Sequence, residues 1–285
     1  MTSDSLNHHC PTCNNTYFGA YCNVCGEKTL QTSEMTMKHF FRKVWNAITF
    51  SDAKFARSLI TLLFYPGKLT TEYFKGRRKL YSAPLSLFFF VNLIYFIYQP
   101  VDAINSTLGS QTTGQFYSPW AEEVVKAKME KEQLDTDAIH AAYNAMTNQV
   151  SKLGLIVFVF LFALGYAVIN INKRDLFYKY IITATHYVSF AVLSTLILIP
   201  TLIIAFIYLY VWTFKITSLD INPNAWYFLW PLTFLLFLYG AIMQRRLFKD
   251  HLLVYFLKTL LIPIALIAAM LVYRWLLFIV TINLI

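Results

Sequence analysis

Hydrophobic residues gather into five long runs along the chain, and polar or charged stretches separate these runs. The runs cover about 83–99, 153–171, 187–214, 225–243 and 259–283. A helix needs roughly 17–25 mostly apolar residues to cross the hydrocarbon core of a bilayer. The pattern therefore predicts an all-α polytopic membrane protein, in which residues 83–285 form a five-helix transmembrane bundle.

For two of these runs, a proline allows more than one path through the membrane. The third run is long enough to tilt or to bend at Pro200. The last run is either a single span or a re-entrant pair about Pro263, which would raise the number of spans to six. Residues 1–30 are polar and lack the apolar stretch of a signal peptide, so we expect the first run to act as an uncleaved insertion signal.

Two shorter amphipathic patterns precede the first run, in residues 31–82. Apolar residues recur at helical spacing between Met37 and Ile48, and the opposite face is basic. A second helix is predicted from near Asp52 to the break at Pro66-Gly67. Such helices can lie in the headgroup region of a membrane or dock on the bundle, and the sequence favours neither arrangement.

Residues 100–152 form the one sizeable loop on the other side of the predicted bundle. Ser118-Pro119 opens a charged helix, and the apolar spacing from Asp137 continues into the second span. This charged character favours a solvated helical hairpin over a cap above an outer cavity.

The composition argues against a soluble chain. Charged residues make up 14% of the chain, about half the usual share, and the mean hydropathy is +0.50. Eleven of the 24 Lys and Arg residues lie in 1–83, three in each of the turns 172–180 and 244–251, and five in the two opposite segments. Because basic loops stay in the cytoplasm, we predict a multi-pass membrane protein with a cytoplasmic N-terminus and an external C-terminus. This topology explains most of the net charge of +9, so nucleic acid is not favoured as a partner.

All four cysteines lie in residues 1–30, as Cys10-Pro-Thr-Cys13 and Cys22-Asn-Val-Cys25. Two C-x-x-C pairs at this spacing are typical of a zinc ribbon, because four thiolates complete the tetrahedral cage that Zn²⁺ favours. Disulfides are disfavoured in the predicted reducing compartment. We therefore predict one structural zinc per chain and, since no position stays open for water, no hydrolytic role.

Neighbouring residues have predicted roles in this ribbon. Gly26 suits a tight turn after the second cysteine pair. Tyr17, Phe18 and Tyr21 are expected to pack over the metal cluster, and His8 and His9 are expected to lie in a solvated tail.

A basic box directly precedes the first span. Its charged residues are Lys75, Arg77, Arg78 and Lys79. Such a cluster either binds anionic lipid headgroups or serves as a plain topology anchor.

Polar residues within the predicted spans are further candidates, because hydrocarbon cannot satisfy them. They are Asn92, His186, Lys258 and Arg274. We expect His186 to form a hydrogen bond between helices, and Lys258 to reach the cytoplasmic surface. Arg274 lies past the midplane of the last span and cannot lose its charge, so it should pair at the outer interface with Asp102, Asp220 or a lipid headgroup.

The segment around the basic box resembles a known family. It contains Phe55-Ala-Arg-Ser-Leu59, Tyr65-Pro-Gly-Lys-Leu69 and Glu72-Tyr-Phe-Lys-Gly-Arg-Arg-Lys-Leu-Tyr81, after the double C-x-x-C ribbon. This pattern resembles the bacterial membrane-protein family catalogued as domain of unknown function 3667, through about residue 98. A weaker resemblance covers Tyr178–Phe190, where this chain has Lys179-Tyr180 in place of the family's Glu-His pair. The resemblance implies this architecture in a bacterial inner (cytoplasmic) membrane, and it implies no chemistry.

The sequence contains no constellation typical of an enzyme. G-x-S-x-G, H-E-x-x-H, P-loop and G-x-G-x-x-G patterns are all absent, and the five runs hold no Asp or Glu. We therefore predict a non-enzymatic membrane scaffold or sensor, whose ribbon binds a cytosolic protein while the bundle sits in the lipid bilayer. The alternative is a channel, or a transporter or flippase for a lipid or amphiphile.

Overall fold

The computed structural model describes residues 8–10, 13–19, 21–26, 53–77, 80–99, 104, 106–173, 175–215 and 226–285. The chain divides between Ala53 and Lys54 into two compact units, and each is described by itself. The amphipathic helix predicted between Met37 and Ile48 lies outside the described residues.

The first unit contains a two-stranded antiparallel sheet. Strand β1 (His8–His9) pairs with β2 (Thr16–Tyr17), with His8 opposite Tyr17 and His9 opposite Thr16. The two histidines thus belong to a strand and not to an irregular tail, whereas the side chain of His9 is exposed, as predicted for a solvated residue.

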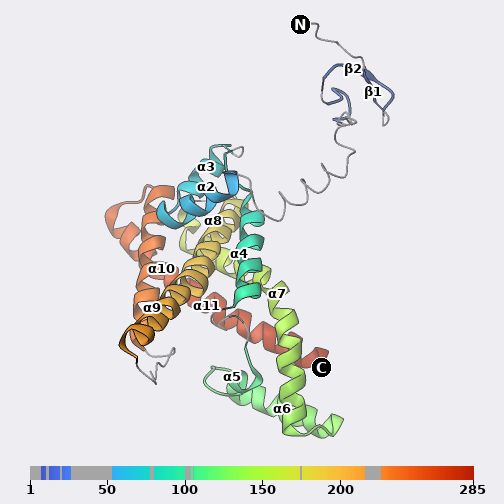
Figure 1. Ribbon diagram of the computed structural model, residues 1–285, viewed down its shortest axis with the longest axis vertical. Coiled ribbons are helices and arrows are strands. Elements are labelled where there is room, and N and C mark those ends of the chain that lie inside the picture. Colours follow the sequence, from blue (N-terminus) through green and yellow to red (C-terminus); the bar gives the residue numbers. More distant parts are fainter. Residues whose placement is uncertain are drawn as a thin grey trace. The chain divides into compact units, whose positions relative to one another are not determined.

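All the elements that the structure describes in the second unit are helices (Figure 1). Its elements are α2 (Ala53–Phe64), α3 (Lys68–Phe74), α4 (Pro84–Tyr98), α5 (Leu108–Thr112), α6 (Ser118–Glu132), α7 (Thr136–Ile169), η2 (Ile171–Lys173), α8 (Phe177–Ala191), η3 (Val192–Leu198), α9 (Ile199–Phe214), α10 (Trp226–Leu247) and α11 (Leu252–Leu284).

Two helices of the described chain are long and apolar enough to cross a membrane, which indicates a membrane protein. They are the continuous stretch Phe177–Phe214 and the helix Leu252–Leu284. A third span results if the two halves of α7, bent by 59°, are counted as one. Helix α4 is apolar but has only 15 residues.

The stretch Phe177–Phe214 changes its hydrogen-bond register just before Pro200. Residues Val192–Leu198 form a π-helix, η3, and the N–H of Ile199 donates to the carbonyl of Ser194, five residues back. Because proline has no N–H to donate, the normal α-helical ladder cannot continue through this position, and a wider turn accommodates it. The sequence therefore located the irregularity correctly but did not specify its form.

Helix α11 runs without a break through Pro263, as a single helix of 33 residues. The alternative of a re-entrant pair about this proline was therefore wrong.

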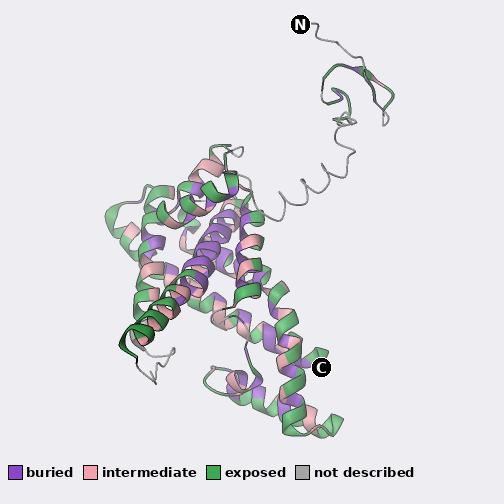
Figure 2. Ribbon diagram, viewed as in Figure 1, coloured by how far each residue is buried: buried purple, intermediate pink, exposed green. Residues whose placement is uncertain are grey.

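Helix α8 forms the centre of the second unit. It contacts α3, α4 and α7, and every residue from Ile182 to Phe190 is buried (Figure 2). Its hydroxyl groups bond back to their own helix: Thr183, Thr185 and Ser189 each donate to the carbonyl four residues earlier. In contrast, Pro200 is the one buried residue of α9, whose exposed side chains are mostly apolar. Apolar exposure of this extent is typical of a lipid-facing surface.

Helices α2 and α3 pack at one end of the helices of this unit (Figure 1). The rings of Phe55 in α2 and Phe90 in α4 lie 4.0 Å apart, and Ser58 Oγ accepts a hydrogen bond from the N–H of Ser82. Helix α2 thus docks on the bundle, which was one of the two arrangements that the sequence left open.

Helices α5 and α6 and the start of α7 pack around the C-terminal end of α11 (Figure 1). Phe278 and Ile282 of α11 share a small core with Leu108, Tyr117 and Tyr143. The predicted helices of this loop exist, and most of their residues are exposed to solvent, while a few buried side chains pack on the long helix α11.

Candidate metal centre and polar sites

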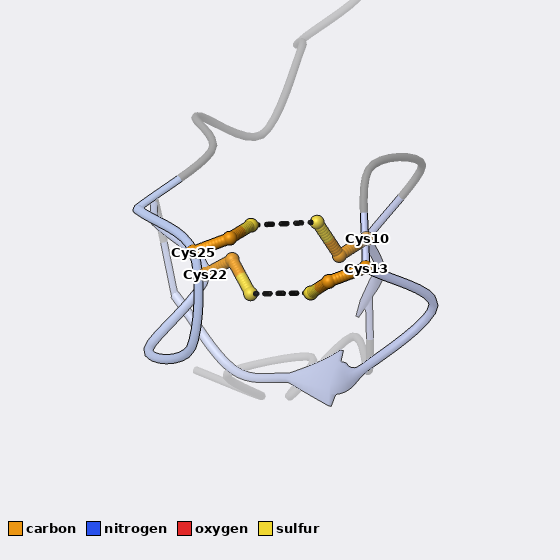
Figure 3. Close-up of side chains that lie close together, drawn as sticks. All are labelled: Cys10, Cys13, Cys22 and Cys25. Atoms are coloured by element: carbon orange, nitrogen blue, oxygen red, sulfur yellow. Dashed lines mark hydrogen bonds between the residues drawn. The ribbon is translucent and has the colours of Figure 1, made fainter.

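The four cysteine side chains converge on one point (Figure 3). Cys10 Sγ lies 3.3 Å from Cys25 Sγ, and Cys13 Sγ lies 3.6 Å from Cys22 Sγ. All four sulfur atoms lie within 4.8 Å of one another. Each close contact joins one cysteine of the first pair to one of the second, so together the two pairs could hold one metal ion.

Two equivalent turns position these sulfur atoms. The N–H of Asn14 donates to the carbonyl of Cys10, and the N–H of Gly26 donates to that of Cys22, each at 2.9 Å. Both donors have a left-handed backbone, with φ of 57° at Asn14 and 77° at Gly26. Glycine and asparagine are the residues that adopt this conformation most readily. The role of Gly26 was predicted, whereas that of Asn14 was missed, although an asparagine directly after a C-x-x-C pair was its signal.

Backbone dipoles favour the thiolate form in the second turn. The N–H groups of Cys25 and then Val24 hydrogen-bond to the sulfur of Cys22 and lower its pKa to about 6, against the opposing effect of burial. Cys22 therefore offers a thiolate at neutral pH, which is the form that binds metals.

Only one of the three nearby aromatic residues covers the cysteine cluster. Tyr17 is buried against Cys10 and Cys22. Phe18 and Tyr21 were expected to pack there too, but they are 66% and 61% exposed. Val24 is also exposed, so the small first unit presents apolar side chains on its surface.

An acidic residue that sequence analysis missed partly neutralises the basic box. Glu72 in α3 pairs with Lys75 at 3.5 Å and with Arg77 at 2.8 Å. The hydrogen bond from Arg77 lowers the pKa of the Glu72 carboxyl. The spacing of three residues between Glu72 and Lys75 was the available signal. Arg78 and Lys79 lie outside the described residues.

Asn92 and His186 are both buried in the second unit. Asn92 donates to the carbonyl of Phe88 in its own helix. His186 Nδ1 lies 2.8 Å from Thr70 Oγ1, so α8 is linked to α3 by a hydrogen bond between helices, as predicted.

Lys258 does not reach the surface, and the prediction that it snorkels was wrong. Its side chain is 7% exposed, and its Nζ lies 3.2 Å from Asp250 Oδ2 and 2.7 Å from Asn172 Oδ1. Asp250 also forms an ion pair with Lys173, whose Nζ lies 2.6 Å from Asp250 Oδ1. Sequence analysis missed Asp250 because it lies in a short turn among basic residues.

Through Gln244, whose Nε2 lies 3.5 Å from Asp250 Oδ2, this ion pair joins a buried polar network that links three helices. Gln244 of α10 donates to Asn170 Oδ1 at 2.8 Å and accepts from the hydroxyl of Tyr166 at 2.6 Å. The hydroxyl of Tyr180 in α8 donates to the carbonyl of Asn170. The network fixes the ends of α7, α8 and α10 relative to Asp250.

Arg274 is half-buried near the other end of α11, and its carbonyl accepts a hydrogen bond from Gln111 of α5. Its two predicted acidic partners, Asp102 and Asp220, lie outside the described residues, so those pairings stay predictions.

The comparison with known families identifies one segment of the chain. Residues 52–96 match the model of the family described as "Protein of unknown function (DUF3667)", which confirms the resemblance over this segment. The match covers α2, α3 and most of α4. No curated protein and no solved structure matches the chain.

Proposed function

We propose that this protein is a multi-pass scaffold or sensor of the bacterial inner membrane, whose zinc ribbon binds a cytosolic protein. The observation that carries this proposal is the four-sulfur cluster beside exposed apolar residues in the first unit.

Zinc is the metal that we assign to the cluster. A tetrahedral site with Zn–S bonds of about 2.3 Å separates its sulfurs by about 3.8 Å. The closest sulfur pairs lie 3.3 Å and 3.6 Å apart, so a small outward movement would give this geometry. Four sulfur ligands leave no place for a substrate or an activated water, which supports a structural and non-enzymatic role.

The proposed topology has five spans, with α4, the second half of α7 and α10 added to the two long helices. Contacts among the segments predicted to be cytoplasmic support it. Arg246 Nη1 donates to the carbonyl of Pro66, Lys173 pairs with Asp250, and Tyr73 bonds to Tyr178. All three segments thus meet at one end of the helices, as a shared cytoplasmic side requires.

The partner surface that we propose is formed by Phe18, Tyr21 and Val24. These side chains are 66%, 61% and 67% exposed on a unit that is too small to bury them. Exposed apolar clusters are typical of interaction sites. A cytosolic protein that covers these side chains would bury their apolar area. Little conformational entropy would be lost on binding, because the metal already fixes the turns that carry them.

Affinity purification of the full chain from membranes tests the proposal with two variants. Replacement of Phe18 and Tyr21 by Ser should keep zinc, as measured by metal analysis, and lose the bound protein. Replacement of Cys22 and Cys25 by Ser should lose both. A protein that stays bound to the Phe18 and Tyr21 variant, or no specific partner for the wild type, would contradict the proposal.

The alternative class, a channel, transporter or flippase, would need a continuous polar path between the helices. His186 contacts Thr70 of α3 at one end of the helical unit, whereas Arg274 contacts α5 at the other. These two contacts thus lie at opposite ends of the described helices, which supports the scaffold.

A further inference from the structure

A small cavity lies where α3, the start of α4 and α8 meet. Its volume is about 120 Å³, and its lining includes Tyr73, Arg77, Tyr81, Ser82 and His186. This volume equals that of about four water molecules at 30 Å³ each, which is enough for one phosphate group but not for a whole lipid.

His186 presents an unsatisfied donor or acceptor at this cavity. The residue is 1% exposed, and Nδ1 bonds to Thr70 while Nε2 has no hydrogen-bond partner among the described residues. A buried polar atom without a partner costs about 1–3 kcal/mol, so such atoms are rare unless a ligand uses them.

The charge around the cavity favours an anion. Arg77 is the one fully charged residue among the described residues of its lining, and its contact with Glu72 uses one of the five N–H groups of the guanidinium. No carboxylate is among the lining residues that the structure describes. The other polar side chains there are the hydroxyls of Tyr73, Tyr81 and Ser82, which can all donate.

The N-terminus of α4 adds a further positive potential. Ala83 is the N-cap of this 15-residue helix and also lines the cavity, and it has no side chain that can cap the helix. Unsatisfied N–H groups at a helix N-terminus attract phosphate and carboxylate groups.

We propose that this cavity binds a phosphate group, with Arg77 neutralising its charge and His186 Nε2–H donating a hydrogen bond to it. The proposal assigns a ligand to His186, which the scaffold function does not require. It also separates Arg77 from Lys75, the other described residue of the basic box, because Lys75 pairs with the same Glu72 and does not line the cavity. The phosphate belongs either to a lipid headgroup or to a soluble phosphate compound.

Matched variants of the full-length protein distinguish a ligand site from a general charge effect. Arg77→Gln and Lys75→Gln each remove one positive charge and one Glu72 contact, but only the first alters the cavity. His186→Asn keeps an amide near the position of Nδ1 and removes the donor at Nε2, whereas His186→Gln places an amide nearer to Nε2.

Binding is measured in two arms. In phospholipid-free detergent, calorimetry measures the affinity for inorganic phosphate. In vesicles of phosphatidylcholine with 10% phosphatidic acid, native mass spectrometry measures the phosphatidic acid retained after extraction. We expect Arg77→Gln and His186→Asn to weaken binding about 10- to 100-fold, as for lost hydrogen bonds to a charged group. Lys75→Gln and His186→Gln should stay within about threefold of wild type on the same scale.

Each outcome bears on the proposal. Binding of inorganic phosphate with this variant pattern supports a soluble ligand, and retention of phosphatidic acid with the same pattern supports a lipid ligand. If neither probe binds, or if Arg77→Gln and Lys75→Gln behave alike, the proposal is wrong. Loss of zinc or of the cytosolic partner in the ribbon variants would leave it unaffected, so the two proposals fail separately.

Discussion

Asp250 neutralises two lysines of the helical unit, and its replacement by Asn directly tests how much the buried network contributes to stability. In the wild type, Lys173 and Lys258 lie 2.6 Å and 3.2 Å from its carboxylate, whose side chain is 3% exposed. Lys173 is 27% exposed and can turn to solvent, but Lys258 is only 7% exposed. Removing one partner of a buried ion pair costs about 3–5 kcal/mol, because the other charge stays buried.

We expect Asp250→Asn to lose about 3 kcal/mol of unfolding free energy, since the amide oxygen of Asn still accepts one hydrogen bond. The matched control is Asp175→Asn, because Asp175 pairs with Lys179 four residues later at a more exposed site. That pair should contribute about 0.3–0.5 kcal/mol. Reversible unfolding in mixed micelles with increasing dodecyl sulfate, followed by circular dichroism, measures both losses.

Two further measurements check the physical reason. The double variant Asp250→Asn with Lys258→Met should regain most of the lost stability, because the uncompensated charge is removed. Burial alone would raise the pKa of Asp250, but hydrogen bonds from Lys173 and Lys258 lower it overall. The folded carboxyl therefore stays ionised to a lower pH than the unfolded carboxyl, whose pKa is about 3.9. Its contribution should therefore be complete above about pH 5 and disappear as the pH falls through the folded pKa. Equal losses in Asp250→Asn and Asp175→Asn would refute the reasoning.

Three other predictions concern the ribbon, the topology and a glycine. The purified protein should carry one zinc per chain, and Cys22→Ser should reduce the zinc content measured by plasma mass spectrometry to near zero. A reporter inserted in 173–179 should be cytoplasmic and one in 107–115 external, and the reverse result would overturn the proposed orientation. Gly67→Ala should destabilise the protein by more than the about 1–2 kcal/mol that a left-handed backbone costs, since a Cβ there would lie 3.1 Å from Met243 Cα. Gly76→Ala, which has the same φ sign but open space, should show the backbone cost alone in the same micelle unfolding assay.

The sequence was most informative where one local signal determines the structure. Paired cysteines identified the cluster, and Pro66-Gly67 marked the end of α2, because thiolate spacing and turn chemistry act within a few residues. It was least informative about long-range pairs. Asp250 and Lys258 lie on two sides of a helix start, and a count of charges along the chain cannot show that they meet in the interior. The same holds for His186 and Arg77, which lie at one cavity only because α3 folds against α8.

The self-bonded hydroxyls of α8 have a consequence for how the protein is made. Each of Thr183, Thr185 and Ser189 satisfies its donor within its own helix, so it needs no neighbour to enter a hydrocarbon environment. We therefore expect the helix that is most enclosed in the finished protein to leave the translocon as an independent segment. Its insertion and its later enclosure by α3, α4 and α7 are then separate events in biogenesis, and defects in packing should yield inserted but unassembled chains.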